Sequence, residues 1–188
     1  HGVFPGNFKT ARITPLLKKI GLDNTDPANY RPISNLNTIS KILERLYLAR
    51  LLPHVNSSPN YNPLQSAYRK RHSTETALLK MANDIHEAMD AGRSTIMIAL
   101  DMSAAFDTID HAVLLHRLEH TFGVTGVALD WIRSSLSNRQ SYVRSGTGQS
   151  EIASVEVGVP QGSVLGPMLF TLFVAPLAKV TESFDIQH

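Results

Sequence analysis

The chain has 188 residues, which is enough for one domain with a hydrophobic core. Hydrophobic residues make up 43% and charged residues 18%, and the net charge of +2 does not by itself identify a nucleic-acid-binding protein. The absence of cysteine excludes disulfides and thiolate metal sites, and no apolar run reaches the roughly 18 residues of a membrane span.

The first part of the chain predicts a strand, an extended segment and a helix. Residues 11–17 indicate a short strand, and residues 21–29 a turn-rich loop. Residues 30–33 are expected to be extended, because a residue before proline is disfavoured in helical conformation. Apolar residues then recur at helical spacing, which predicts a helix over 38–52 that Pro53 ends.

The middle of the chain predicts a capped helix followed by a buried strand. Ser73 or Thr74 can cap a helix that Gly92 ends. Residues 95–100 are continuously apolar, which is typical of a buried strand, and this strand would deliver Asp101 at its end. The apolar face of the helix would consist of Ala77, Leu78, Met81, Ile85 and Met89.

Further helices and a hairpin are expected after Asp110. Asp110 can cap a helix, and a second helix is expected over 127–136. Residues 142–144 and 152–157 indicate the two strands of a hairpin.

The last part predicts a loop over 158–162 and one apolar helix over 164–178, with Pro167 in its first turn. Strands and helices are mixed without strict alternation. The expected fold class is therefore α+β, with helices packed on one face of a small sheet.

Three segments, in this order, resemble the motifs of reverse transcriptases. They are NYRPISNL at 29–36, ALDMSAAFD at 99–107 and VPQGSVLGP at 159–167. A fourth, QSAYRKRHST at 65–74, looks like the second fingers motif of that family. The segments NYRPIS and SAAFDTIDH are similar to those in the reverse transcriptases of non-long-terminal-repeat (LINE-type) retrotransposons.

The resemblance implies the fingers and palm of a right-handed polymerase. Residues 1–188 would form a single domain, with about 9–93 mainly fingers and about 94–188 mainly palm, and fingers elements could intervene at 112–158. The family's Tyr/Phe-Ala-Asp-Asp turn, which supplies further metal carboxylates, does not occur in the sequence. We therefore expect a fragment without a thumb, with an incomplete palm sheet and an open apolar edge, that is inactive alone.

Asp101 is the expected catalytic carboxylate. Nucleotide addition is an in-line phosphoryl transfer in which two Mg²⁺ ions neutralise the charge on the entering and leaving oxygens. Mg²⁺ prefers carboxylate oxygen, and the resemblance adds the backbone carbonyl of Met102 as a ligand. From its position alone, Asp101 could equally cap a helix or pair with a cation.

Phe106 matches the family's aromatic that lies under the incoming sugar and leaves no room for a 2′-hydroxyl. Without the motif it would be an ordinary core phenylalanine. Asp107 and Asp110 are not expected to bind metal, because Asp110 suits a helix cap and Asp107 suits a bond to nearby backbone.

Cations and a loop complete the expected site. Arg31 would bind the triphosphate of the incoming dNTP, because its guanidinium fork binds phosphate bidentately. Lys18 or Lys19 would add a second cation, and the sequence does not choose between them.

The loop over 158–162 would place Gln161 against the nucleotide sugar or the template edge, and Gly162 close to template or primer. In the second fingers motif, Arg69 and Lys70 would meet template backbone or the triphosphate. Arg71 stands where such enzymes commonly have glycine, and in a positive-φ turn it would cost roughly 1 kcal/mol.

The implied partners are an RNA template, a DNA primer and dNTPs, and the implied location is intracellular and nuclear. Two alternative chemistries carry less weight. His111, His116 and His120 lack the HExxH pattern of a zinc site, and Ser163 lacks the G-x-S-x-G context of a nucleophile. A decayed element that at most binds nucleic acid remains the alternative function.

Overall fold

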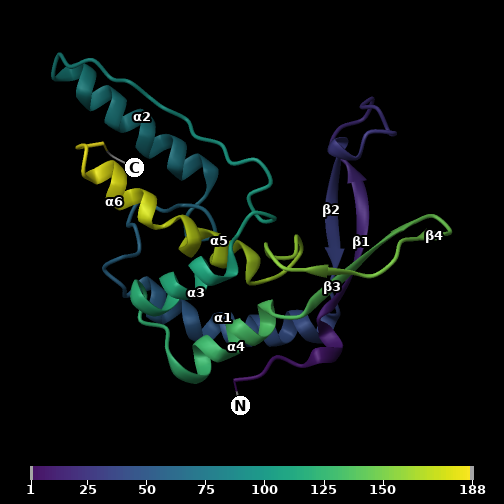
Figure 1. The fold of residues 1–188 in the computed structure, drawn as a ribbon. Helices are drawn as coiled ribbons and strands as arrows, with labels where there is room; N and C mark the ends of the chain where they lie inside the picture. Colours follow the sequence, from purple (N-terminus) through teal and green to yellow (C-terminus); the bar gives the residue numbers. More distant parts are fainter. Residues whose placement is uncertain (1, 187–188) are drawn as a thin grey trace.

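The structure is a computed structural model, and it describes residues 2–186. Helices gather on one side and a mixed sheet stands on the other (Figure 1). This is the mixed helix-and-sheet class that the sequence predicted. The strands are β1 (Thr10–Leu17), β2 (Tyr30–Asn35), β3 (Arg139–Ser145), β4 (Gly148–Gln149) and β5 (Ala153–Val155). The helices are α1 (Thr38–Asn56), α2 (Thr74–Asp90), α3 (His111–His120), α4 (Gly126–Leu136), α5 (Gly166–Val174) and α6 (Pro176–Glu182), with 3₁₀ turns at Gly6–Phe8 and Pro27–Asn29.

The sheet joins segments that are far apart in the sequence. Its order is β2-β1-β3-β4, with β5 also paired to β3. β1 runs antiparallel to β2 and parallel to β3, and Arg31 on β2 pairs with Leu16 on β1. The predicted strand over 11–17 and the extended segment over 30–33 are confirmed. The predicted hairpin is present, but residues 139–141, and not 142–144, pair with its second strand, which covers 153–155.

The hydrophobic core lies among the helices. Four side chains from α3, α4 and α5 are completely buried, namely Leu114, Leu118, Ile132 and Leu172. They belong to one cluster that also includes Leu51 and Val55 of α1. None of the described helices is long and apolar enough to cross a membrane.

α1 starts as predicted, but it does not end at Pro53. Asn37 caps the helix by accepting a hydrogen bond from the Ile39 N–H, and the helix continues through Pro53 to Asn56. Tertiary contacts outweigh the N–H that proline lacks, because Val55 is fully buried and the His54 ring bonds to the Phe122 carbonyl at 2.6 Å. The predicted helix end is therefore wrong by one turn.

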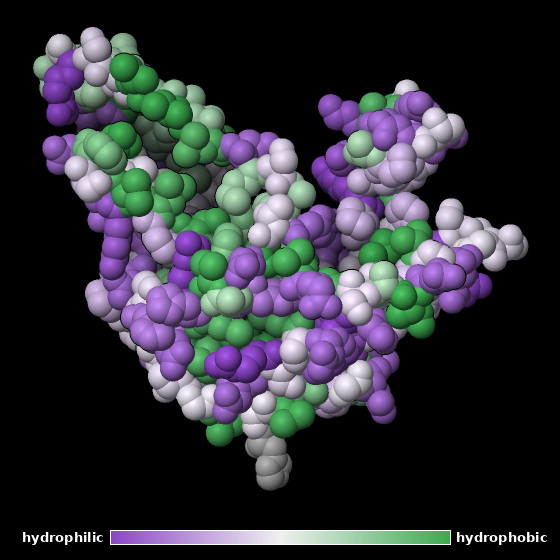
Figure 2. Space-filling model, in the orientation of Figure 1, coloured by the Kyte–Doolittle hydropathy of each residue, from purple (hydrophilic) through white to green (hydrophobic). Residues whose placement is uncertain are grey.

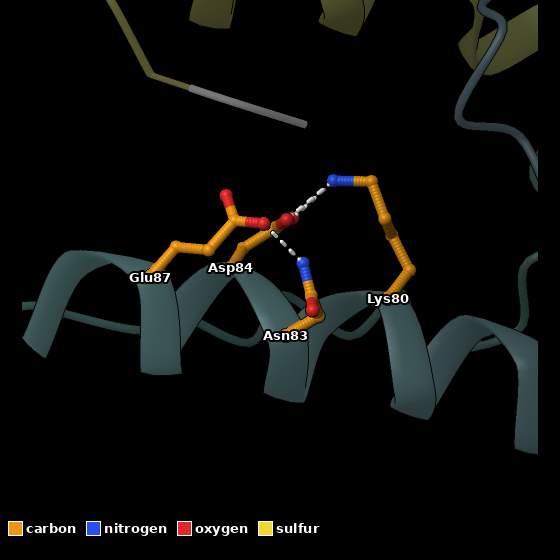
Figure 3. Close-up of polar contacts among 4 residues, drawn as sticks. All are labelled: Lys80, Asn83, Asp84 and Glu87. Atoms are coloured by element: carbon orange, nitrogen blue, oxygen red, sulfur yellow. Dashed lines mark hydrogen bonds and ion pairs between the residues drawn. The ribbon is translucent and has the colours of Figure 1, made fainter. Parts of the chain in front are cut away.

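α2 begins and ends as predicted, yet none of its described residues is buried. Ser73 forms a capping box with Thr76, and Gly92 follows the helix with a φ of +67°. Pairs four residues apart link Lys80 to Asp84 and Asn83 to Glu87 along its surface (Figure 3). Such pairs add only about 0.2–0.5 kcal/mol each, so α2 is held weakly.

The predicted strand over 95–100 is wrong. These residues are irregular and exposed, with Ile96 87% and Leu100 72% accessible. A strand is stabilised by hydrogen bonds to a neighbour, and no segment of the described chain pairs with this one. Figure 2 shows apolar surface over the arm that contains α2 and α6. Because exposed apolar surface favours association between molecules, aggregation is expected.

The apolar segment at the C-terminal end of the described chain forms two helices, not the single helix predicted over 164–178. α5 starts at Gly166 and ends at Val174, and α6 starts at Pro176. Proline has no N–H to continue α5, but it is well tolerated in the first turn of a new helix. The chain direction changes there, and α6 runs out beside α2 (Figure 1).

Candidate functional site

A cleft with a volume of about 920 Å³ lies between the β1–β2 pair and the segment that follows residue 100. In Figure 2 the surface is hollowed between the arm formed by α2 and α6 and the arm formed by β1 and β2. Three stretches line the cleft, namely residues 30–33, 101–107 and 160–163, together with Lys18, Tyr68 and Pro167.

Most of the residues that the sequence singled out meet in this cleft. Its lining includes Lys18, Arg31, Asp101, Met102, Phe106, Gln161 and Gly162. Lys19, Arg69 and Lys70 are not in the lining. The cleft therefore brings together residues from three motifs that are up to about 130 positions apart in the chain, and of the two adjacent lysines it takes Lys18.

The turn that carries Asp101 and Phe106 is attached to the loop at 158–160. The Val159 N–H donates to the Phe106 carbonyl at 2.7 Å, and the ring of Phe106 lies 5.6 Å from that of Phe170. Ala104, within the turn, has a φ of +53°. Phe106 is thus held half-buried at the cleft wall, while the Asp101 side chain is exposed to the cleft.

Gly158 makes this attachment possible. Its φ is +81°, and a Cβ there would lie 2.8 Å from the Asp107 Cα and from the Phe106 carbonyl oxygen. Distances this short do not occur for real Cβ atoms, so only glycine allows the two segments to approach this closely. The His111 ring also bonds to the Gly158 carbonyl at 2.7 Å.

The two cationic side chains of the cleft, Lys18 and Arg31, lie at one end of the β1–β2 pair. The Lys18 ammonium donates to the Ala28 carbonyl at 2.8 Å, which holds it at the mouth of the loop between the strands. Arg31 follows on β2 with an exposed side chain. Both side chains lie at the same end of the antiparallel pair, because Arg31 is opposite Leu16 in the register.

The loop that carries Gln161 is bonded to β2. The Ser34 N–H donates to the Gln161 carbonyl at 2.8 Å. Gly162 has a φ of +113°, and a Cβ there would lie 2.7 Å from the Ser34 carbonyl oxygen. Burial raises the pKa of the Asp107 carboxyl, and the Gln161 side chain opposes that shift.

The segment around Arg69 folds back on itself. The Arg69 guanidinium donates to the Pro63 carbonyl at 2.6 Å and lies 5.8 Å from the centre of the Tyr61 ring. Arg71 has a φ of +67°, so the positive φ anticipated at this position is present. Tyr68, with a φ of +59°, reaches the cleft instead.

Sequence reasoning missed some residues at the site. Tyr30, Tyr68 and Ser163 line the cleft, and although each lies in a quoted motif, none was assigned a role in nucleotide binding. Asp107, which was not expected to bind metal, also lines the cleft. Glu44 was overlooked, although it stands seven residues before Leu51 on what is the buried face of α1, where an acid is out of place.

Metal ligands in the described part of the cleft could come from two carboxylates, Asp107 and the expected ligand, Asp101. A carboxylate is the donor type that Mg²⁺ prefers, but residues 2–186 contain no group of three or more His, Asp or Glu side chains placed to hold an ion. The rings of His116 and His120 stack at 4.1 Å, and His111 is bonded to backbone. The cleft thus offers carboxylate oxygen, the donor that a magnesium site uses, at Asp101 and Asp107.

Comparison with known proteins matches the chain to reverse transcriptases. A family model described as reverse transcriptase (RNA-dependent DNA polymerase) matches residues 17–188. The chain is 34% identical over 187 residues to the RNA-directed DNA polymerase from mobile element jockey of Drosophila melanogaster, covering 100% of this chain and 20% of that protein.

Other relatives carry similar names. The chain is 33% identical to the probable RNA-directed DNA polymerase from transposon BS of Drosophila melanogaster, over 93% of this chain and 19% of that protein. It is 29% identical to the retrovirus-related Pol polyprotein from type-1 retrotransposable element R2 of Popillia japonica, over 93% of this chain and 24% of that protein. The chain thus spans roughly a fifth of the length of these curated relatives.

Proposed function

This chain belongs to the reverse transcriptase family, and from that premise we propose that its cleft is the nucleotide site of an RNA-directed DNA polymerase. The observation that carries the proposal is the convergence of Arg31, Asp101, Phe106 and Gln161 on one cleft. In the protein that contains this chain, the reaction would be template-directed addition of dNTPs to a primer.

The cleft offers a different group for each part of a dNTP. Arg31 and Lys18 lie on one wall and would bind the triphosphate. The Phe106 ring and the Gln161 side chain would enclose the sugar, with the ring occupying the space that a 2′-hydroxyl needs. A dNTP held in this way would have its α-phosphate directed toward Asp101.

Asp101 and the Met102 carbonyl would hold Mg²⁺. Two such ions, when bound, neutralise the charge that develops on the entering and leaving oxygens. Asp101 is one of the carboxylates that such a site requires. Asp101 would hold the ion at the cleft wall, and Phe106 would position the sugar beside it.

The nucleic acid would run past the same cleft. Gly162, which lines the cleft, would lie against template or primer. Arg69 and Lys70 would contact template backbone. Residues 9–93 would then be mainly fingers and residues 94–188 mainly palm, and copying would take place in the nucleus at the target DNA.

Primer extension by the full-length protein tests the proposal. The assay uses an RNA template, a DNA primer, dNTPs and Mg²⁺, and compares the wild type with Asp101→Asn. Loss of a metal carboxylate is expected to lower kcat by at least about 10³-fold. Asp90→Asn, at the exposed end of α2, is the matched control and should keep wild-type kcat. Equal activity of Asp101→Asn and the wild type would reject the assignment.

A further inference from the structure

Glu44 is a buried carboxylate in the middle of α1, only 3% exposed. One of its oxygens, Oε2, accepts three hydrogen bonds, from the Ser163 hydroxyl at 2.8 Å, the Val164 N–H at 2.7 Å and the Leu165 N–H at 3.2 Å. The other oxygen, Oε1, accepts from the Ser40 hydroxyl at 3.3 Å. An ionised carboxylate is tolerated at such depth because its oxygens are satisfied in this way.

The donors lie about 120 residues away, where the loop after Gln161 enters α5. Leu165 is the N-cap residue of α5, and it has no side-chain oxygen to satisfy the first N–H groups. The Ser163 hydroxyl accepts a hydrogen bond from the Gly166 N–H at 3.0 Å, and the Glu44 carboxylate accepts hydrogen bonds from the Val164 and Leu165 N–H groups. The negative charge also suits the positive end of the helix dipole.

Arg139 is a buried cation whose pKa is affected by the charge of Glu44. Arg139, 5% exposed, donates from Nη1 to the Ser135 carbonyl at 2.8 Å. Burial lowers the pKa of Arg139, and the charge of Glu44 opposes that shift. Among the described residues no ion pair joins the two side chains, so Glu44 acts on Arg139 only at longer range.

The loop is thus fixed on two sides. On one side β2 holds the Gln161 carbonyl through the Ser34 N–H, and Gly162 packs directly against Ser34. On the other side Glu44 holds Ser163 and the two residues after it. Gln161, whose carbonyl is part of the first attachment, lines the cleft directly before the second.

We propose that Glu44 is a positioning residue that sets Gln161 against the sugar of the incoming nucleotide. The inference rests on the proposed function, since it assumes that the cleft binds a dNTP. Glu44 does not itself line the cleft, so it acts through the backbone of residues 163–165. Its substitution should weaken nucleotide binding more than it slows the chemical step.

The test measures kcat and the KM for dNTP in primer extension by the full-length protein. Glu44→Gln keeps the size of the side chain but removes its charge, and the KM is expected to rise about tenfold while kcat changes less than about threefold. The matched control is Glu119→Gln, which removes the charge of an exposed glutamate on α3 and should leave both constants unchanged.

A double-mutant cycle separates positioning from general loss of structure. If Glu44 acts through Gln161, then adding Glu44→Gln to Gln161→Ala should not raise the KM further. If the two increases multiply, or if folded Glu44→Gln keeps the wild-type KM, the inference is overturned.

A milder variant covers the case in which Glu44→Gln does not fold. Ser163→Ala removes one of the hydrogen bonds to Glu44 and should raise the KM about threefold, and an unchanged KM there would also overturn the inference. Failure of the proposed function looks different, because Asp101→Asn would then extend primers as well as the wild type does.

Discussion

Arg71 sits in the left-handed region, with a φ of +67°, in the turn that precedes α2. An L side chain in this conformation costs roughly 1–2 kcal/mol. Glycine removes that strain, but it also raises the conformational entropy of the unfolded chain, which offsets part of the gain. Arg71→Gly should therefore raise the free energy of unfolding by about 0.5–1 kcal/mol, measured by urea denaturation. Arg71→Ala keeps the Cβ and should gain nothing, and an equal gain in both variants would contradict the backbone explanation.

Single residues of the site could be predicted only where a motif carries them. Asp101 and Phe106 stand five positions apart in one motif, and the structure places both at the cleft. Sequence left Lys18 and Lys19 undecided, because the choice depends on strand twist and on the bond from Lys18 to Ala28. Glu44 has partners about 120 positions away, and nothing local to α1 names them.

α2 is the element whose stability depends most on local interactions. No described residue of it is buried, so its cap contributes a large share of what holds its first turn. Ser73→Ala should cost about 1 kcal/mol locally, seen as roughly fivefold faster amide hydrogen exchange over residues 76–80. The comparison is Asp110→Ala, which removes the cap of α3.

Asp110→Ala gives a different result because α3 contributes Leu114 and Leu118 to the core. The Asp110→Ala substitution should lower the free energy of global unfolding, and it should not speed amide hydrogen exchange in one helix alone. Uniform protection of α2 in both variants would show that tertiary contacts, and not the cap, hold that helix.

Elements were predictable where local signals and packing agree. Ser73, Asp110 and the spacing of apolar residues located α2 and α3. The prediction failed over 95–100, because β-propensity needs a pairing strand and the described chain offers none. It failed in the opposite sense at Pro53, where burial of Val55 extends a helix that proline should end.

At the scale of the whole molecule, the cleft is an arrangement that no local pattern contains. β1 and β2 bring Lys18 and Arg31 to one wall, and the loop at 158–163 is joined to both sides by backbone hydrogen bonds. Sequence indicated the class of fold and the order of the motifs. The parallel pairing of β1 with β3, residues about 130 positions apart, came only from the structure.

The cleft is proposed to enclose the sugar of a nucleotide beside Asp101. The most direct measurement is the ratio of kcat/KM for a dNTP to that for the matching rNTP, in primer extension by the full-length protein. The wild type should favour the dNTP, and Phe106→Val should lower the ratio at least about tenfold, because a smaller side chain admits the 2′-hydroxyl. Phe184→Val, 71% exposed at the end of α6, should leave the ratio unchanged. A folded, active Phe106→Val protein with the wild-type ratio would contradict the claim.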